Sequence, residues 1–357
     1  MGREQRRRAQ RQRRSVGRPS HSVPSAASPV TFDARPDGEP YPMAIRFVGR
    51  RTGATGEQRS GDTFDVVEKV DRVVPGSGRI TVSKRVGGIT AGTWEAAAAP
   101  VPVAGLSGSV QPGFTSTSGA SGWAPAVQVI APGVRLGAWP GLVVLGAVVA
   151  VALLLVLVAR AGLPVGPVLV LAAIACLVGI AGAKLYYLVE HPDQWRRPKT
   201  TGMCIQGFVL AAVATITAGA LALAIPVGTL LDATAPGLMF GQAIGRVGCF
   251  LGGCCVGRPV RRGLWSSDRR VGMRRIPTQL FESAGAMLIG GVALVAVLVS
   301  LRPGGVVFVG TIAAYTLLRQ FLFPLRDLPR NTSWGRTATA VASALVTVGV
   351  IAVAVVG

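Results

Sequence analysis

After residue 135 the sequence is a succession of long apolar runs, and this limits the possible folds most. A helix crossing a hydrocarbon core of ~30 Å, at about 1.5 Å per residue, needs ~20 such residues. Half of the 357 residues are hydrophobic and only 15% are charged, as in membrane proteins. We therefore predict an all-α polytopic membrane protein with about seven spans, at approximately Trp139–Ala159, Val165–Val189, Met203–Ile225, Gly228–Phe250, Thr278–Ser300, Gly304–Phe323 and Thr337–Val356.

The segment before these runs is polar and opens with a strongly basic stretch. Residues 1–30 combine many arginines with Ser, Ala and Pro and have no apolar core, so they do not have the pattern of a cleavable secretory signal. We interpret them as a disordered arm that is attracted to anionic membrane lipid, and we expect no nucleic-acid partner.

Residues 31–104 show a different pattern, with short alternating runs separated by Gly and Pro. Alternation with period two is typical of strands with one buried face. The run ITAGTWEAAA fits an edge of an immunoglobulin-like sandwich. We predict a small all-β, Ig-like sandwich domain here, then a Gly/Ser/Pro linker over residues 105–133 and the membrane domain over 134–357.

Several polar side chains interrupt the apolar runs near their ends. Such groups are costly in a membrane unless they face the bundle interior or a wet cavity. A single arginine near a span end fits snorkelling to the headgroups equally well. Several such residues together favour a functional site. These polar residues are Arg246, Arg319, Asp232, Gln206 and Glu282.

Loop charge gives an orientation, because Lys and Arg concentrate on the cytoplasmic side. Most Lys and Arg outside the spans of this part of the chain follow the second, fourth and sixth runs. With the basic amino terminus, this favours an amino terminus inside and a carboxyl terminus outside.

Five cysteines occur, and three of them, Cys249, Cys254 and Cys255, lie close together in the sequence. No histidine is near and no second CxxC pair completes a tetrahedral set, so we expect no metal site and no cofactor. A redox pair is possible in an oxidising compartment. Small packing residues beneath a Gly-rich turn are the favoured interpretation.

The stretch GRVGCFLGGCCVGRP at 245–259 resembles the signature of prolipoprotein diacylglyceryl transferases. Further motifs resemble that family in the same order, over roughly residues 134–357, and these are VRLGAWPGLVVLG, GAKLYYLVEHP, GMCIQGFVLA, IPTQLFE and YTLLRQFLFPLRDLPR. The resemblance implies transfer of a diacylglyceryl group from phosphatidylglycerol to the lipobox cysteine of a prolipoprotein signal peptide, in the bacterial plasma membrane. It also places the site on the outer face, opposite to the charge count, so the orientation stays open.

The resemblance implies roles for individual residues. Arg246 and Arg319 would hold the anionic leaving group, and Glu282 would orient Arg246 or act as a base. Glycines of the signature would allow a tight turn near a headgroup. The substrate-binding residues implied in this way are Gln206, Gly207, Gly245, Gly248, Cys249 and Gln279.

The chain also departs from the family pattern. Gln206 stands where the family has a histidine and cannot take a proton at neutral pH. Cys249 and Cys254 replace a family asparagine and glutamate. Three interpretations follow: an active transferase, a catalytically silent relative that binds lipid or lipoprotein, and a membrane thiol protein, with the first favoured.

Overall fold

The computed structural model of the chain describes residues 24–53, 61–101, 115–120, 122–123, 133–135, 137–192, 195, 202–299, 304–327 and 334–356. The predicted basic arm up to residue 23, most of the predicted linker and the basic residues 196–199 lie outside these ranges. The chain forms two compact units, one of residues 1–138 with 250–277, and one of residues 139–249 with 278–357. Each is described by itself.

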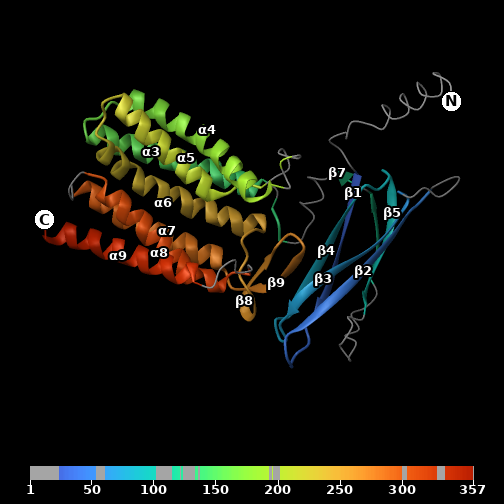
Figure 1. Ribbon diagram of the computed structural model, residues 1–357. Helices are drawn as coiled ribbons and strands as arrows, with labels where there is room; N and C mark the ends of the chain where they lie inside the picture. Colours follow the sequence, from blue (N-terminus) through green and yellow to red (C-terminus); the bar gives the residue numbers. More distant parts are fainter. Residues whose placement is uncertain are drawn as a thin grey trace, which may run out of the picture. The chain divides into compact units, whose positions relative to one another are not determined.

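The first unit is built from β-strands (Figure 1). Its strands are β1 (Pro24–Asp33), β2 (Tyr41–Arg51), β3 (Thr63–Val73), β4 (Arg79–Gly87), β5 (Thr93–Val101), β6 (Thr115–Ala120), β7 (Gly122–Trp123), β8 (Pro259–Ser267) and β9 (Val271–Arg275). They form a five-stranded sheet in the order β7-β1-β4-β9-β8 and a four-stranded sheet in the order β3-β2-β5-β6. β1 begins before the predicted start of the β domain, and β6 lies within the predicted linker.

One hydrophobic cluster joins the two sheets. Phe32 and Ile80 contribute from the first sheet, and Ile45, Phe47 and Val73 from the second. The alternation of buried and exposed residues along β2 explains why these side chains share one face. The predicted β domain is therefore present, and the more specific immunoglobulin-like assignment stays a prediction.

The hairpin of β8 and β9 comes from a distant part of the chain, between two helices of the second unit. β9 pairs antiparallel with β4, with Thr81 opposite Gly272 and Val82 opposite Val271. Val271 and Met273 are 4% and 2% exposed and belong to the shared cluster. A segment that looked like a basic loop in the sequence therefore completes the amino-terminal β domain.

Replacing Met273 with alanine tests this contribution. Deleting a buried methionine side chain from a core destabilises by about 2–5 kcal/mol, so we expect the β domain of the variant to be cleaved much faster in limited proteolysis. Leu264→Ala is the matched control, because Leu264 lies in the same hairpin and is 47% exposed. Equal cleavage rates for the two variants would contradict this role of the hairpin.

The second unit is a bundle of seven helices among the described residues. They are α3 (Ala138–Arg160), α4 (Val165–Glu190), α5 (Ile205–Ala222), α6 (Val227–Gly252), α7 (Thr278–Leu298), α8 (Val306–Leu322) and α9 (Gly335–Val356), and the short 3-10 helix η3 (Phe323–Leu325) follows α8. Six of them are long and apolar enough to cross a membrane; α6 does not meet that criterion. Large apolar side chains such as Leu177 and Leu288 are exposed, as expected for surfaces that face lipid.

Glycines allow close helix packing in this bundle. A Cβ atom added to Gly146 of α3 would lie 2.6 Å from the carbonyl oxygen of Gly241 in α6, and one added to Gly237 would lie 2.6 Å from that of Ala150. Small residues let membrane helices approach closely. This packing holds α6, which carries Asp232, Gln242 and Arg246, directly against α3.

Candidate functional site

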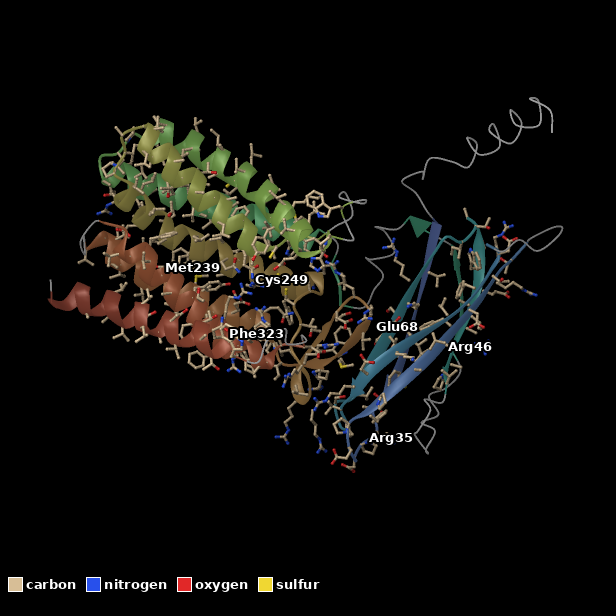
Figure 2. All side chains as sticks on the ribbon, viewed as in Figure 1. Arg35, Arg46, Glu68, Met239, Cys249 and Phe323 are labelled. Atoms are coloured by element: carbon tan, nitrogen blue, oxygen red, sulfur yellow. The ribbon has the colours of Figure 1, made fainter. Side chains whose placement is uncertain are left out.

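A cluster of charged side chains forms where three helix ends meet. Arg246 lies in the last two turns of α6, Glu282 in the second turn of α7 and Arg319 in the last turn of α8, while Arg326 directly follows η3. Cys249 and Phe323, which mark the ends of α6 and α8, lie at the same end of the bundle in Figure 2, whereas Met239 lies further along α6. The helices thus bring together groups that are far apart in the sequence.

Glu282 is the centre of the cluster and is fully buried. Its Oε1 lies 3.0 Å from Nη2 of Arg246 and 3.7 Å from Nε of Arg319. Its Oε2 accepts a hydrogen bond from Nη2 of Arg326. A buried carboxylate is stable only when paired and hydrogen-bonded, and three guanidinium groups provide this pairing.

Tyr315 and Gln242 extend the cluster. The Tyr315 hydroxyl donates to Oε1 of Glu282 at 2.7 Å, and Nε2 of Gln242 donates to the Tyr315 hydroxyl at 2.7 Å. With its amide turned over, the Gln242 oxygen accepts instead from Nε and Nη2 of Arg246 at 2.9 and 3.2 Å. In both orientations Gln242 connects α6 to the cluster and limits the movement of the side chains around it.

The charges of the cluster do not cancel. Three arginines contact one carboxylate, so the four groups carry two positive charges in excess. Arg246 and Arg326 are buried, while the Arg319 side chain is 25% exposed. Fixed guanidinium groups at low dielectric attract anions, and Arg319 is the most exposed of these three arginines.

The structure brings together three of the predicted residues, Arg246, Glu282 and Arg319. Gln279 is 1% exposed and lies one turn before Glu282 on α7. Gln206 lies differently: it is in the first turn of α5, its side chain is exposed, and its Oε1 accepts from the Cys204 thiol at 2.7 Å.

The predicted glycines serve packing in part. Gly207 is buried, and a Cβ atom added there would lie 2.3 Å from the carbonyl oxygen of Gly182 in α4. Gly245 and Gly248 lie inside α6, so the expected tight turn is wrong for these two, because the helix continues through them. A Cβ atom on Gly248 would lie 3.2 Å from Cβ of Leu142, which shows that the position packs on α3.

Asp232 does not belong to the cluster, although the sequence grouped it with Arg246. Its carboxylate accepts from the backbone nitrogens of Gly304 at 3.3 Å, Gly305 at 2.9 Å and Phe308 at 2.9 Å. It therefore caps the first turn of α8, where backbone N–H groups lack partners within the helix. Fourteen residues of helix separate it from Arg246, which is about 21 Å.

Arg326, Tyr315 and Gln242 also belong to the cluster, although they were not among the site residues predicted from the sequence. Arg326 was counted only as a loop charge, because it follows the apolar run. Its spacing of seven residues from Arg319 was the available signal, since seven residues make two helical turns and return to the same face. Tyr315 lies one turn before Arg319 on that face.

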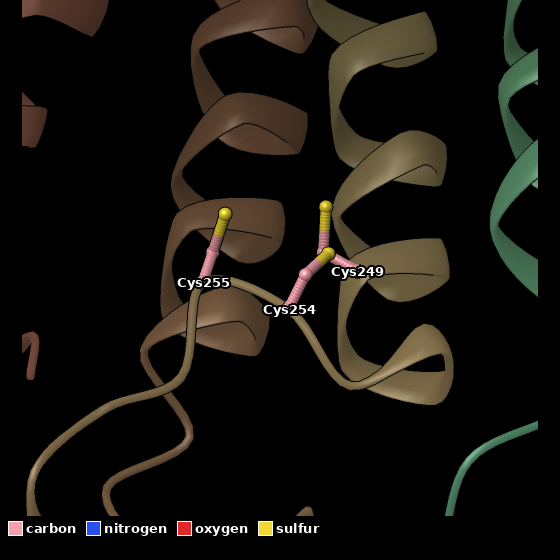
Figure 3. Close-up of side chains that lie close together, drawn as sticks. All are labelled: Cys249, Cys254 and Cys255. Carbon is pink, nitrogen blue, oxygen red and sulfur yellow. The ribbon is translucent and has the colours of Figure 1, made fainter. Parts of the chain in front are cut away.

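The three clustered cysteines lie at the end of α6 and in the turn that follows it (Figure 3). Cys249 is buried in the helix, Cys254 is half-buried and Cys255 is exposed. Their three Sγ atoms lie within 4.8 Å of one another. Because all three belong to one continuous stretch of seven residues, local backbone geometry sets these separations.

Comparison with known proteins gives one consistent result. The sequence profile named prolipoprotein diacylglyceryl transferase matches residues 128–356. A phosphatidylglycerol–prolipoprotein diacylglyceryl transferase of Dehalococcoides mccartyi is 32% identical over 166 residues, which is 43% of this chain and 62% of that protein. A protein of the same name from Bacillus cereus is 32% identical over 186 residues, 47% of this chain and 68% of that protein. The chain thus spans less than two thirds of the first of these relatives.

Proposed function

Because the chain belongs to the prolipoprotein diacylglyceryl transferase family, we propose that it transfers a diacylglyceryl group from phosphatidylglycerol to the cysteine thiol in the lipobox of a prolipoprotein. The match covers well over half of the chain. Family membership and six apolar helices make it a multi-pass protein of the bacterial plasma membrane. Phosphatidylglycerol and the prolipoprotein signal peptide are accordingly the proposed partners.

The arginine cluster around Glu282 is the observation that carries this proposal. The reaction breaks the bond between the glyceryl carbon and a phosphate oxygen, so negative charge develops on the departing glycerol phosphate. Arg246 and Arg319 present planar donor groups that match a phosphate. Donors that are already in place when the charge develops stabilise the transition state.

Glu282 keeps the arginines in place before the substrate arrives. Without a carboxylate at the centre, three like charges would repel one another and turn toward the membrane surface. Its Oε1 already contacts Arg246, Arg319 and Tyr315, so we assign Glu282 a positioning role and do not use it as the base. The phosphate would then meet guanidinium groups whose positions Glu282 has already set.

Strand pairing supports a further part of the proposal, that α6 is a span and the total is seven. β9 follows α6 in the chain and pairs with β4, which precedes α3. Both strands therefore lie on one side of the membrane, which requires an even number of crossings between them. α3, α4 and α5 supply three apolar candidates, so α6 would be the fourth.

Expression of the full chain in bacteria depleted of their own transferase tests the function. We expect lipid attachment to a reporter prolipoprotein to be restored, measured by its mass. Arg319→Ala should lower the initial rate of transfer about 100-fold, the effect of removing one transition-state donor. Arg160→Ala is the matched control, because it removes the exposed charge of Arg160, the last residue of α3.

A measurement of phosphatidylglycerol binding distinguishes an active transferase from a catalytically silent relative. A chain that binds the lipid but transfers nothing would be a silent relative, and this would overturn the proposed activity. Equal rates for Arg319→Ala and Arg160→Ala would overturn the role of the cluster.

A further inference from the structure

The proposed reaction includes a proton removal for which neither Gln206 nor Glu282 is suited. The attacking thiol must become a thiolate. Gln206, at the position where the family resemblance implies a histidine, cannot accept a proton at neutral pH, and its side chain is exposed at the start of α5. The carboxylate of Glu282 is already engaged by three arginines and a tyrosine.

Three cysteines follow Arg246 closely in the sequence, and the first of them lies within α6. Cys249 follows Arg246 by three residues, so the two side chains share one face of the helix, and both are buried. The Sγ atoms of Cys249, Cys254 and Cys255 lie within 4.8 Å of one another (Figure 3). In a tetrahedral zinc site with Zn–S distances of 2.3 Å, neighbouring sulfurs are ~3.8 Å apart, so side-chain adjustments of about 1 Å complete the geometry.

The turn that follows α6 has an unusual backbone conformation. Gly253 has φ +67° and Cys255 has φ 55°. The left-handed region is unfavourable for a side chain such as cysteine, and such conformations persist where the surrounding structure holds them, often at functional sites. In this turn the chain reverses after α6 and brings Cys254 and Cys255 back toward Cys249.

From these observations we propose that Cys249, Cys254 and Cys255 bind Zn²⁺ as thiolates and leave its fourth position for the thiol of the incoming prolipoprotein. This inference rests on the proposed function. Three protein ligands with one open position are the usual arrangement of catalytic zinc. The half-buried Cys254 and the exposed Cys255 make the site accessible to a peptide thiol. Zn²⁺ with three thiolates carries one negative charge in total, and coordination of the precursor thiolate raises this to two.

In the proposed reaction, zinc would supply the thiolate of the precursor. The precursor thiol displaces a water from Zn²⁺ and loses its proton to solvent, because zinc coordination deprotonates a thiol outright. The bound sulfur attacks the glyceryl carbon, a C–S bond forms and the C–O bond to phosphate breaks. The electron pair leaves on the glycerol phosphate oxygen, which Arg246 and Arg319 hold. The neutral thioether product is a weak ligand, so water replaces it.

Metal content is the first test. The full chain, purified in mild detergent without chelator and supplied with one equivalent of Zn²⁺, should retain about one zinc per chain after desalting, measured by mass spectrometry of the elements. The triple Cys249→Ser, Cys254→Ser, Cys255→Ser variant should retain at least tenfold less. Cys176→Ser, in the middle of α4, is the matched control and should retain as much as the wild type. A zinc-free wild type, or a disulfide among the three cysteines in the intact protein, would overturn the proposal.

Cobalt substitution tests the open fourth position. Co²⁺ bound by thiolates gives an intense near-ultraviolet absorption band, and adding a lipobox peptide should increase and shift this band. The same peptide with serine in place of its cysteine should leave the spectrum unchanged. Identical spectra with both peptides would overturn the role in thiol activation.

Activity then distinguishes failure of this inference from failure of the proposed function. Transfer that continues undiminished in the triple variant would overturn the zinc proposal and leave the transferase assignment intact. Zinc binding and a cysteine-dependent cobalt shift without any transfer would overturn the transferase assignment and leave the thiol-binding metal site intact.

Discussion

Replacing Glu282 with glutamine is expected to lower the stability of the helical unit by about 3–5 kcal/mol, the cost of removing one partner from a buried ion pair. The carboxylate is fully buried and contacts Arg246, Arg319 and Arg326. A neutral amide leaves three guanidinium groups close together without a counter-charge. We therefore expect a fall in the midpoint of thermal unfolding of about 10 °C, measured in detergent, and loss of most transfer activity.

Two further variants separate charge from position at this residue. Glu282→Asp keeps the charge but shortens the side chain, so it should retain more stability than the glutamine variant while its arginines are displaced. Glu190→Gln is the control, because Glu190 is exposed at the end of α4, and it should unfold like the wild type. A glutamine variant at position 282 that is as stable as this control would disprove the central role of the carboxylate.

Replacing Arg246 with alanine is expected to reduce transfer about 1000-fold, at the upper end of the effect of losing one transition-state donor. Arg246 is 7% exposed, so water does not screen its interaction with a bound phosphate. Arg246→Lys keeps the charge and loses the planar pair of donors, and it should retain an intermediate rate. Rates measured with saturating phosphatidylglycerol separate this loss from weaker lipid binding.

The control for Arg246 is an arginine that does not belong to the cluster. Arg274 lies in β9 and is exposed, so Arg274→Ala removes a positive charge without touching the cluster. It should transfer at nearly the wild-type rate. If the two alanine variants were equally impaired, the net positive charge of the protein would explain the effect, and the specific role of Arg246 would be disproved.

The helices could be predicted from the sequence because hydrophobic run length is a local signal. The predicted span at Thr278–Ser300 compares with α7 at Thr278–Leu298. α6 was found from its position between apolar runs, although Asp232 and Arg246 lower its hydropathy. Run length could not show that these two residues have different roles. Asp232 caps the start of α8 and Arg246 contacts Glu282, and both contacts depend on how the helices pack.

Contacts between distant segments account for what the sequence could not show. Arg326 joins the site through a tertiary contact with Glu282, which lies 44 residues earlier, and its local sequence resembles any basic loop. The pairing of β9 with β4 likewise has no local signal, because strand propensity does not identify a partner. The three cysteines lie close together in the sequence, but the distances between their sulfur atoms depend on a backbone turn in which Cys255 has a left-handed conformation.

The late strand also affects how the protein is made. β4 is synthesised long before β9, since Val82 and its partner Val271 are separated by most of the helical segment. At about 5–20 residues per second, a ribosome needs roughly 10–40 s to pass from one to the other. During this time β4 is an open sheet edge beside an incomplete core, a state prone to aggregation. The amino-terminal domain, although translated first, can finish folding only after the hairpin that follows α6 has emerged.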